Sequence, residues 1–485
     1  MTESVYTFLS VLNNSIVRKL INSSSKACPR CGKSHLEIAL DNYIGNRDKN
    51  RRCVKGRLVS SAVKYALGKS GKAFGVSEEQ LKQGLNDPYI RRGIANILAG
   101  TATFGVTKPQ TVGAPFLVVW NYTNACNLKC KHCYQNADKH SLGELSTIQR
   151  KEIIDQLDQE NVVTVAFSGG EPLMRNDFFE IARYAAKKGI YVSMASNGTM
   201  ITRSVATRLK EVGVGYVDVS LDGAKPETHE SFRGVPGCFE KTIEGIKNLV
   251  EGGISTCVAV TATKRNLYEI PKIVELAKRL KVRRIIVFNF IPTGRGQELS
   301  DIDLIPTERE LLLEYLYDEL AKGEIETLCT APQLARVCLI NSQKTGRDIV
   351  APTHFCATDF SGRIKYLTDF IGGCGAGRLY CAVQPNGLVT PCVFIPIVVG
   401  DLRKQSLNEI WRHSPVLDDL RERGKLKGRC GRCQFKYVCG GCRARAYAYY
   451  QDYLTPDPGC IREIEEPSIE FAGELGVMSA KAGGR

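Results

Sequence analysis

The chain contains 485 residues with a formal net charge of +15, a hydrophobic fraction of 43% and a charged fraction of 24%. Its length predicts two or three domains, and its composition is typical of a globular protein. No apolar run reaches the length of a membrane-spanning helix, and the amino-terminal residues lack the pattern of a secretory signal. These observations argue against a transmembrane helix and predict a cytoplasmic location.

The chain has 19 cysteines, and an odd number cannot form a complete set of disulfides. Many cysteines in the reducing cytoplasm favour metal ligation over disulfide bonds. The cysteines also fall into short runs with regular spacing. Metal binding is therefore the first interpretation of these runs.

Residues 1–110 form a basic amino-terminal region. Residues 1–108 contain 18 Lys and Arg against 7 Asp and Glu, and six of the basic residues lie between positions 47 and 57. Such a patch suits a phospholipid surface, nucleic acid, an acidic protein or an anionic substrate, and a solvated loop is an equal alternative. Nucleic acid is not expected as a partner, whereas peripheral membrane contact through this region stays open.

The same region carries a short metal-binding pattern. Cys28 and Cys31 form a CxxC turn of the kind that opens zinc and rubredoxin sites, and His35 and Cys53 lie nearby, so a zinc or iron site is chemically feasible. No cysteine follows Cys53 at the expected spacing, which makes a degenerate or structural remnant an equal alternative. The rest of the region is predicted to be mostly helical, with a break at the Asp87-Pro88 dipeptide.

Residues 111–300 alternate short apolar runs with longer amphipathic stretches, as parallel strands joined by helices do. The predicted fold is therefore α/β, a partial (β/α)6 TIM-like barrel with six units in place of eight. In such barrels the chemistry lies at the carboxyl ends of the strands. The predicted strands are Phe116–Thr123, Thr164–Gly169, Tyr191–Ser196, Tyr216–Leu221, Thr256–Thr263 and Arg284–Ile291.

Four of these strands end in residues that can carry chemistry. Cys126, Cys130 and Cys133 follow the first strand, and three thiolates can hold three irons of a [4Fe-4S] cluster while the fourth iron stays open. A zinc site or a purely structural iron site is the alternative. The motifs SGGEP at 168–172, SNGT at 196–199 and SLDG at 220–223 end the next three strands. We expect all four strand ends to converge on one mouth of the barrel.

The CxxxCxxC spacing with a following aromatic residue, together with GGEP and SLDG in this order, resembles the radical S-adenosylmethionine (SAM) superfamily. The resemblance implies that the open iron chelates the amino and carboxylate groups of SAM. It further implies that an electron from the reduced cluster cleaves SAM to a 5'-deoxyadenosyl radical. The residues that the resemblance places around SAM are Tyr134, Gly169, Gly170, Glu171, Pro172, Asn197, Ser220 and Asp222.

The resemblance also implies a role for each of these side chains. Tyr134 would lie against the adenine, and Glu171 would accept from the methionyl amine, which the preceding glycines allow to approach closely. Asn197 would position the nucleoside, and Ser220 and Asp222 would bind the ribose hydroxyls. Turn formation is the alternative for Gly-Gly-Glu-Pro and for the Ser and Asp that precede a glycine.

Few side chains outside the clusters are candidates for contact with substrate. Arg233 would contact the SAM carboxylate or the substrate, and Arg295 the substrate, although exposed arginines are usually solvated or ion-paired. Residues 301–370 are predicted to be a helical linker region. No catalytic residue is assigned there beyond Cys356, which we would test as a general acid or hydrogen donor. Core packing is the interpretation of the remaining cysteines, which are Cys238, Cys257, Cys329 and Cys338.

Residues 371–465 hold a second, dense cysteine set, and residues 466–485 are expected to form a flexible tail. Eight thiolates suffice for two fully ligated [4Fe-4S] clusters, and a zinc ribbon built on CxxC pairs is the alternative. Fully ligated clusters would have no open iron, so we expect them to carry electrons to or from the active site. The eight residues are Cys374, Cys381, Cys392, Cys430, Cys433, Cys439, Cys442 and Cys460.

This second set resembles the SPASM extension of radical SAM enzymes, through Gly387-x4-Cys392 and the CxxC-x5-C run that begins at Cys430. Only two residues separate Cys439 from Cys442, where the usual pattern has three, which puts the geometry of Cys442 in question. The resemblance implies two interleaved ligand sets. The first is Cys374, Cys381, Cys392 and Cys442, and the second is Cys430, Cys433, Cys439 and Cys460.

The sequence thus predicts a radical SAM enzyme with three [4Fe-4S] clusters, SAM and an electron donor such as ferredoxin or flavodoxin. Its reaction would begin with abstraction of a hydrogen atom from the substrate, as in an oxidoreductase or a C–H functionalising transferase. Peptide or protein maturation is the first hypothesis for the substrate. Modification of an anionic small molecule, such as a tetrapyrrole of heme biosynthesis or a lipid, is the second. A non-catalytic iron-sulfur carrier or sensor is the third.

Overall fold

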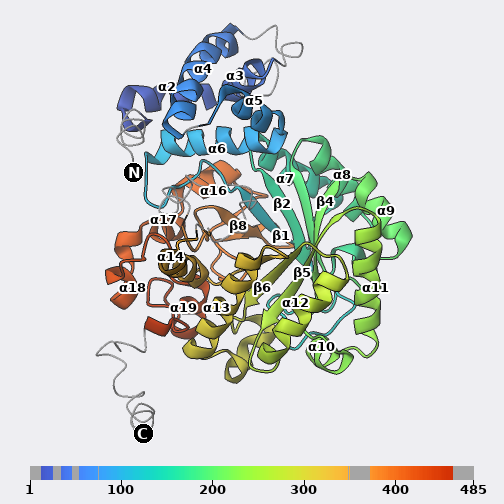
Figure 1. Ribbon diagram of the computed structural model, residues 1–485. Coiled ribbons are helices and arrows are strands. Elements are labelled where there is room, and N and C mark those ends of the chain that lie inside the picture. The colour runs from blue at the N-terminus through green and yellow to red at the C-terminus, as the bar shows by residue number, and fades with distance from the viewer. Residues whose placement is uncertain are drawn as a thin grey trace.

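A ten-stranded sheet forms the centre of the molecule (Figure 1). The computed structural model describes residues 12–25, 34–45, 54–74, 76–141, 143–347, 349 and 372–462. The strands are β1 (Leu117–Thr123), β2 (Thr164–Gly169), β3 (Tyr191–Ser196), β4 (Val214–Ser220), β5 (Ser255–Ala262), β6 (Arg284–Asn289), β7 (Glu326–Cys329), β8 (Tyr380–Val383), β9 (Leu388–Thr390) and β10 (Gly400–Asp401).

The sheet has the order β10-β9-β8-β1-β2-β3-β4-β5-β6-β7. All neighbours from β8 to β7 are parallel, and β9 and β10 add an antiparallel edge. The predicted α/β fold with a partial parallel barrel is confirmed, because all six predicted strands occur in the predicted order. Two strands that were not predicted, β7 and β8, extend the parallel part at its two edges.

Helices cover the outer face of the sheet, as the connection of parallel strands requires. Side chains alternate along each strand, so that Val258 and Val260 of β5 join the core under the helices, whereas Cys257 and Ala259 face an inner cluster. The helices after β1 to β7 are α7 (Thr147–Gln159), α8 (Phe178–Lys187), α9 (Arg203–Glu211), α10 (Pro226–Arg233), α11 (Cys238–Glu251), α12 (Ile270–Arg279), α13 (Pro306–Lys322) and α14 (Gln333–Thr345).

Local sequence fixes where several of these helices begin. In α7 the Ser146 hydroxyl accepts from the Gln149 amide, and the Gln149 side chain accepts from the Ser146 amide, which completes a capping box. Short 3₁₀ helices occupy several loops. They are η1 (Pro172–Met174), η2 (Leu267–Glu269), η3 (Gly294–Glu298), η4 (Ser300–Ile302) and η6 (Arg423–Lys425).

The carboxyl-terminal part packs beside the barrel, to the left in Figure 1. Arg445 fastens it to the loop after β6, because its buried guanidinium donates to the Asn289 side chain at 2.6 Å and also meets Asp303 and the Phe290 carbonyl. Asp303 is in turn paired with Arg309 at 2.9 Å. The helices of this part are α16 (Leu407–His413), α17 (Pro415–Arg421), α18 (Gly428–Arg432) and α19 (Arg443–Tyr450).

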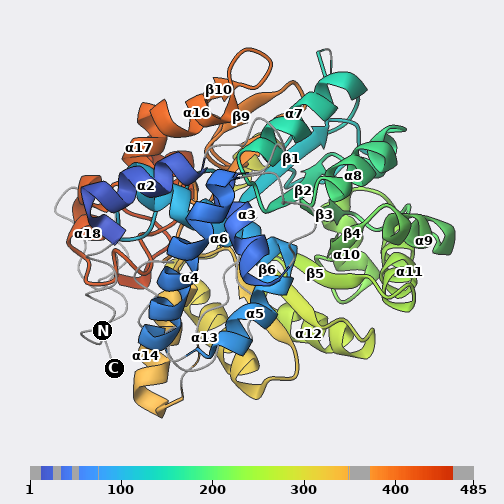
Figure 2. The ribbon, with the colours of Figure 1, turned by 90° about the horizontal axis from the view of Figure 1, so that it is seen from above.

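The described amino-terminal residues are mostly helical. The predicted break at Asp87-Pro88 is present, because Asp87 caps the following helix and accepts from the Tyr89 amide at 2.7 Å. Figure 2, seen from above, shows these helices lying over the barrel. They are α2 (Ser15–Ser25), α3 (His35–Tyr43), α4 (Val54–Phe74), α5 (Glu78–Asn86) and α6 (Pro88–Phe104).

Helix α6 crosses the amino ends of the parallel strands. The Arg92 guanidinium donates to the carbonyls of Val162 and Lys188, at 2.7 and 3.2 Å, and these residues lie in the loops that lead into β2 and β3. It also pairs with Asp158 at 2.7 Å. The described amino-terminal helices therefore cover the end of the barrel opposite to the strands' carboxyl ends. In the described part of the chain, no helix combines the length and the apolar character needed to cross a membrane.

Candidate functional site

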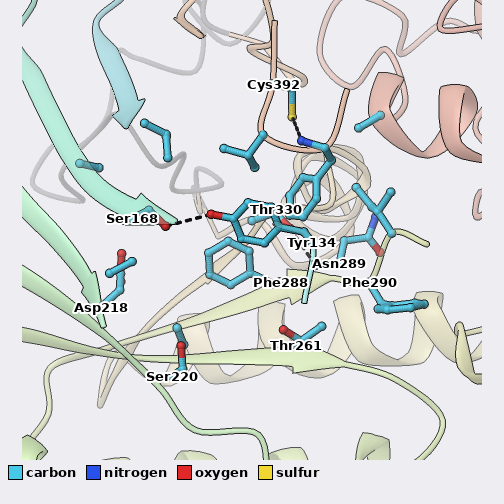
Figure 3. Close-up of a pocket in the computed structure, with 18 of the residues that line it drawn as sticks. Tyr134, Ser168, Asp218, Ser220, Thr261, Phe288, Asn289, Phe290, Thr330 and Cys392 are labelled. Atoms are coloured by element: carbon cyan, nitrogen blue, oxygen red, sulfur yellow. Dashed lines mark hydrogen bonds between the residues drawn. The ribbon is translucent and has the colours of Figure 1, made fainter. Parts of the chain in front are cut away.

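A cavity of about 350 Å3 opens at the carboxyl ends of the parallel strands. Its wall includes Cys126, Cys130 and Cys133 from the loop after β1. Figure 3 shows Tyr134 in the middle of this space, with polar side chains from β2, β4 and β5 around it and Cys392 on the opposite side. Cys374, Cys392 and Cys442 from the carboxyl-terminal part also line it. Two cysteine sets that are far apart in the sequence therefore share one cavity.

The cysteine loop is held from two sides. Arg295 donates to the carbonyls of Cys130 and Ala137 at 2.8 and 2.6 Å. Both terminal nitrogens of its guanidinium therefore bind the backbone of the cysteine loop. A side chain at Gly294 would lie 2.2 Å from the Tyr134 carbonyl, which only glycine allows. Arg295 therefore lies beneath the loop and is not among the residues that line the cavity.

Gly169 and Gly170 line the cavity, but their own backbone neighbours explain why they are glycines. Gly169 has φ +104° in the region that favours glycine, and a Cβ atom at Gly170 would lie 2.1 Å from the Ala125 carbonyl. The amides of Gly170 and Glu171 donate to the carbonyls of Thr123 and Ala125, at 2.7 and 2.8 Å. The glycine pair thus brings the end of β2 against the start of the cysteine loop.

Glu171 is fully buried and lies outside the wall of the cavity. Its carboxylate accepts from the Ser196 hydroxyl at 3.0 Å and from the Asn197 amide at 2.9 Å, and Pro172 begins η1 beside it. Burial raises the pKa of Glu171 to about 7, against the lowering effect of these hydrogen bonds. Glu171 therefore joins the ends of β2 and β3 and presents no oxygen to the cavity in this structure.

Besides the two glycines, three of the predicted SAM contacts line the cavity, namely Tyr134, Asn197 and Ser220. The Tyr134 hydroxyl lies 3.0 Å from the Ser168 hydroxyl and donates to the Asn121 side chain at 2.9 Å. The Asn197 side chain accepts from the Thr199 amide and donates to the Asn127 side chain, at 2.9 and 2.8 Å. These bonds fix the orientation of the two polar side chains at the cavity wall.

Asp222 has a different environment from that expected for a ribose contact. It has no exposed surface and forms an ion pair with Arg233 at 2.6 Å. Its other oxygen accepts from the Thr261 amide at 2.8 Å. Burial opposes ionisation, but the Arg233 guanidinium holds the pKa of Asp222 below its usual value. Asp222 is thus the counter-ion of Arg233, which itself lines the cavity and lies 3.6 Å from the Cys130 sulfur.

Asp218 is a cavity residue that the sequence reading missed. It accepts from the Tyr216 hydroxyl at 2.8 Å, and burial raises its pKa to about 6. Figure 3 shows Asp218, Ser220 and Thr261 along the strands that border the cavity. The available signal was the alternation along β4, since residues 216, 218 and 220 share the face that bears Ser220.

The other carboxyl-terminal cysteines gather at a second, smaller cavity. Its wall includes Cys430, Cys433, Cys439 and Cys460, which is the second of the two predicted ligand sets. Of the first predicted set, Cys374, Cys392 and Cys442 line the large cavity, whereas Cys381 lies in the core beneath the helices. Cys439 and Cys442, although only two residues separate them, therefore border different cavities.

The donor chemistry of these sites suits iron-sulfur clusters. Each cavity is bordered by several cysteine sulfurs, which are the ligands of [4Fe-4S] clusters. Among the described residues no group of three His, Cys, Asp or Glu side chains is arranged to hold a single metal ion. A [4Fe-4S] cluster is larger than a single ion, so its cysteine ligands lie further apart. Cysteines spread over the wall of a cavity therefore suit a cluster better than a single metal ion.

The sequence matches the Radical SAM superfamily over residues 120–277 and the SPASM iron-sulfur cluster-binding domain over residues 374–434. An AdoMet-dependent heme synthase of Methanosarcina barkeri is 40% identical over 351 residues, which cover 72% of this chain and 97% of that protein. The chain belongs to the radical SAM superfamily. As a radical SAM enzyme with a SPASM domain, it is built for iron-sulfur clusters and SAM.

A maturase and a solved crystal structure are also similar to this radical SAM enzyme. The mycofactocin maturase MftC of Mycobacterium tuberculosis is 34% identical over 367 residues, covering 73% of this chain and 85% of that protein. The crystal structure of Streptococcus suis SuiB bound to S-adenosylmethionine has a TM-score of 0.60 at 16% identity, covering 88% of this chain and 92% of SuiB. The likeness to SuiB supports the fold alone.

The remaining predicted positions of this radical SAM enzyme lie elsewhere. Cys28, Cys31, Cys53 and Cys356 fall outside the described residues. His35 is described, and it is a buried residue at the start of α3. Cys238, Cys257 and Cys338 are buried in hydrophobic clusters, as expected, whereas Cys329 borders the large cavity.

Proposed function

We propose that this enzyme reductively cleaves SAM to a 5'-deoxyadenosyl radical, which abstracts a hydrogen atom from a substrate bound between the two cysteine sets. The shared cavity carries this proposal, because it is bordered both by Cys126, Cys130 and Cys133 and by cysteines of the SPASM domain. A cluster held by Cys126, Cys130 and Cys133 would supply the electron for cleavage. This reaction class comprises oxidoreductases and C–H functionalising transferases, and the substrate decides between them.

We propose three [4Fe-4S] clusters for the enzyme. Cys126, Cys130 and Cys133 hold the cluster that binds SAM. Cys430, Cys433, Cys439 and Cys460 suit a fully ligated cluster, because all four border one small cavity. The SPASM cysteines of the large cavity hold the third. A zinc or iron site at Cys28, Cys31, His35 and Cys53 stays a separate proposal.

The cavity wall suggests how the chain's own residues position SAM. Tyr134, Asn197 and Ser220 present polar groups to the cavity from three strand ends, which suits the adenosyl part. Glu171 acts as a positioning residue, since its carboxylate fixes the Asn197 backbone and does not reach the cavity wall. Asp222 likewise acts through Arg233. The guanidinium, 3.6 Å from the Cys130 sulfur, is placed to meet an anionic group bound at that cluster.

A heme precursor is the first substrate that we propose. The support is the relationship to two AdoMet-dependent heme synthases, of Methanosarcina barkeri and Nitratidesulfovibrio vulgaris, at 40% and 35% identity over nearly their whole lengths. Both exceed the identity to the peptide maturase. This reverses the order of the two substrate hypotheses, and the small anionic molecule now comes first.

Peptide maturation is the second candidate, and the charge of the cavity favours it. Among the described residues, the wall contains no lysine, and Arg233 is its only arginine. That guanidinium is already paired with Asp222. The carboxylates of a tetrapyrrole would therefore meet few unpaired cations, whereas hydroxyl and aromatic side chains such as Thr261, Thr330 and Phe288 suit a peptide backbone.

Two partners follow from the reaction. A small reductant protein such as ferredoxin or flavodoxin would supply the electrons, and the cytoplasm is the compartment that holds such donors and keeps cysteines reduced. The basic region is a candidate for peripheral membrane contact. Its described helices lie at the amino ends of the strands, so we do not assign them to substrate binding in the cavity.

Anaerobic reconstitution tests the proposal. Wild type should bind about twelve irons per chain, and a Cys126/Cys130/Cys133 triple alanine variant about eight, because each cluster holds four. With dithionite and SAM, wild type should form 5'-deoxyadenosine and the triple variant none. Iron near four in wild type would contradict the auxiliary clusters, and absence of 5'-deoxyadenosine would favour a carrier or sensor. Stimulation by an iron tetrapyrrole or by a precursor peptide then separates the two substrate candidates.

A further inference from the structure

Strand β8 places two neighbouring residues on opposite faces of the sheet. Tyr380 pairs with Leu117 of β1, and both residues line the large cavity. Cys381 pairs with Val118, and both are fully buried in the core under the helices. Because side chains alternate along a strand, Cys381 points away from the cavity that Tyr380 faces.

The surroundings of Cys381 confirm its direction. The core between the sheet and the covering helices, called the outer core below, contains Cys381 together with Trp411 of α16 and Leu417 of α17. Arg421 also lies near it, and this side chain stacks on Trp411 and donates to the Gly377 carbonyl at 2.9 Å. None of the other cysteines of its predicted ligand set is in this core. The sheet itself therefore separates the Cys381 thiol from them.

The other three predicted ligands remain together. Cys374, Cys392 and Cys442 belong to one cluster of packed residues and line the same cavity. Tyr380 donates its hydroxyl to the Cys392 sulfur at 2.7 Å, which fixes that thiol at the cavity wall. Three thiolates provide ligands for three irons of a four-iron cluster.

A change of register would be needed to bring Cys381 to the others. A slip of one residue in β8 would turn every side chain of the strand to the opposite face. It would move Tyr380 into the outer core and Val383 out of it, although Val383 is fully buried there. The parallel pairing of Tyr380, Cys381, Ala382 and Val383 with residues 117–120 of β1 opposes such a slip.

We propose that the auxiliary cluster beside the active site has only three cysteine ligands, Cys374, Cys392 and Cys442, and that its fourth iron is open to the cavity. This iron would bind an anionic oxygen or sulfur donor of the substrate, a carboxylate or a thiolate. The substrate would thus be held opposite Cys126, Cys130 and Cys133, across the same cavity. The inference rests on the proposed function, since it assumes that the SPASM cysteines hold iron-sulfur clusters.

Iron counting and electron paramagnetic resonance test the ligand set without enzymatic turnover. In the Cys126/Cys130/Cys133 triple alanine background only the auxiliary clusters remain. Adding Cys381→Val should leave about eight irons and the same spectrum, whereas adding Cys374→Ala should remove about four irons or convert one signal. The matched control is Cys338→Val, another cysteine buried in the outer core with no proposed ligand role.

Loss of about four irons in Cys381→Val, with Cys338→Val unchanged and both variants folded by circular dichroism, would overturn the proposal. A small-ligand experiment tests the open iron directly. In the triple alanine background, labelled cyanide should give hyperfine coupling on one auxiliary signal, and absence of any coupling would also overturn it. Failure of the proposed function itself is distinguishable, because wild type would then bind about four irons before any Cys381 variant is made.

Discussion

Replacing Arg233 with methionine removes the counter-ion of a carboxylate that has no contact with solvent. Asp222 and Arg233 meet at 2.6 Å as an ion pair, although the two groups are not aligned as a hydrogen bond. His132 lies 3.4 Å from the same carboxylate, but burial lowers its pKa to about 4, so it is neutral at pH 7. After the substitution the Thr261 amide remains as a neutral donor, and no positive charge compensates Asp222.

Breaking a buried ion pair by removing one partner costs roughly 3–5 kcal/mol of folding free energy. For a cooperative unit of the size of this barrel, that loss corresponds to about 6–20 °C in the unfolding temperature. Asp222→Asn leaves the guanidinium unpaired and should destabilise the fold in the same direction. The double variant should lose less than the sum of the single variants, because neither charge is then left alone.

Anaerobic thermal unfolding of the four proteins, followed by circular dichroism, measures these losses, and equilibrium dialysis with SAM measures binding. The control is the exposed pair Arg203–Glu251, whose removal should not change the unfolding temperature measurably. If Asp222→Asn unfolds like wild type but binds SAM weakly, then Asp222 is a ribose contact, as the sequence suggested, and the reasoning from the ion pair is refuted.

Three further predictions concern other parts of the molecule. Gly170→Ala should displace the cysteine loop, since its Cβ would meet the Ala125 carbonyl at 2.1 Å, and should lower bound iron by about four per chain, whereas Gly84→Ala in α5, with open space around it, should not. Retention of all iron in Gly170→Ala would contradict the close approach. Asp218 has a pKa raised to about 6 by burial, so its stabilising contribution exists below pH 4 and is lost as the pH rises through 6. The stability gained by Asp218→Asn should therefore grow by about 1 kcal/mol from pH 5 to pH 8 in urea unfolding, and a pH-independent difference would be inconsistent with this. Arg92→Met should cost roughly 2–3 kcal/mol and speed hydrogen exchange in α6, because a charged donor to two carbonyls is lost. The exposed Lys82→Met should leave exchange in α6 unchanged, and equal exchange in both variants would show that Arg92 does not hold α6 in place.

The six central strands were predictable because each is a short run rich in apolar and β-branched residues between turn residues, which local pattern alone reveals. Strand β7 was missed since its four residues, Glu326–Cys329, include only one aliphatic side chain, and it forms by pairing with β6. Strand β8 was missed for a different reason. Its partner Leu117 lies more than 260 residues away, so the pairing leaves no local signal.

The candidate site was predictable to the level of motifs. Spacing identified the cysteine loop and the strand ends, but not the direction of each side chain. Glu171 and Asp222 both belong to motifs at the mouth, yet both carboxylates are buried against partners, Ser196 and Arg233, that the motif does not name. For Cys381 a signal existed, since the alternation in Tyr-Cys-Ala-Val assigns it to the face opposite Tyr380 once a strand is recognised there.

The clamped cysteine loop has a consequence for how the enzyme acquires its iron. A side chain at Gly234 would lie 2.6 Å from the Lys129 carbonyl, and one at Gly294 would lie 2.2 Å from the Tyr134 carbonyl, so two loops press on the cysteine loop along its backbone. The conformational entropy of these residues is therefore lost during folding of the barrel and not when metal arrives. The apoprotein thus presents a preformed site, and we expect the cysteine loop to rearrange little when a cluster is inserted.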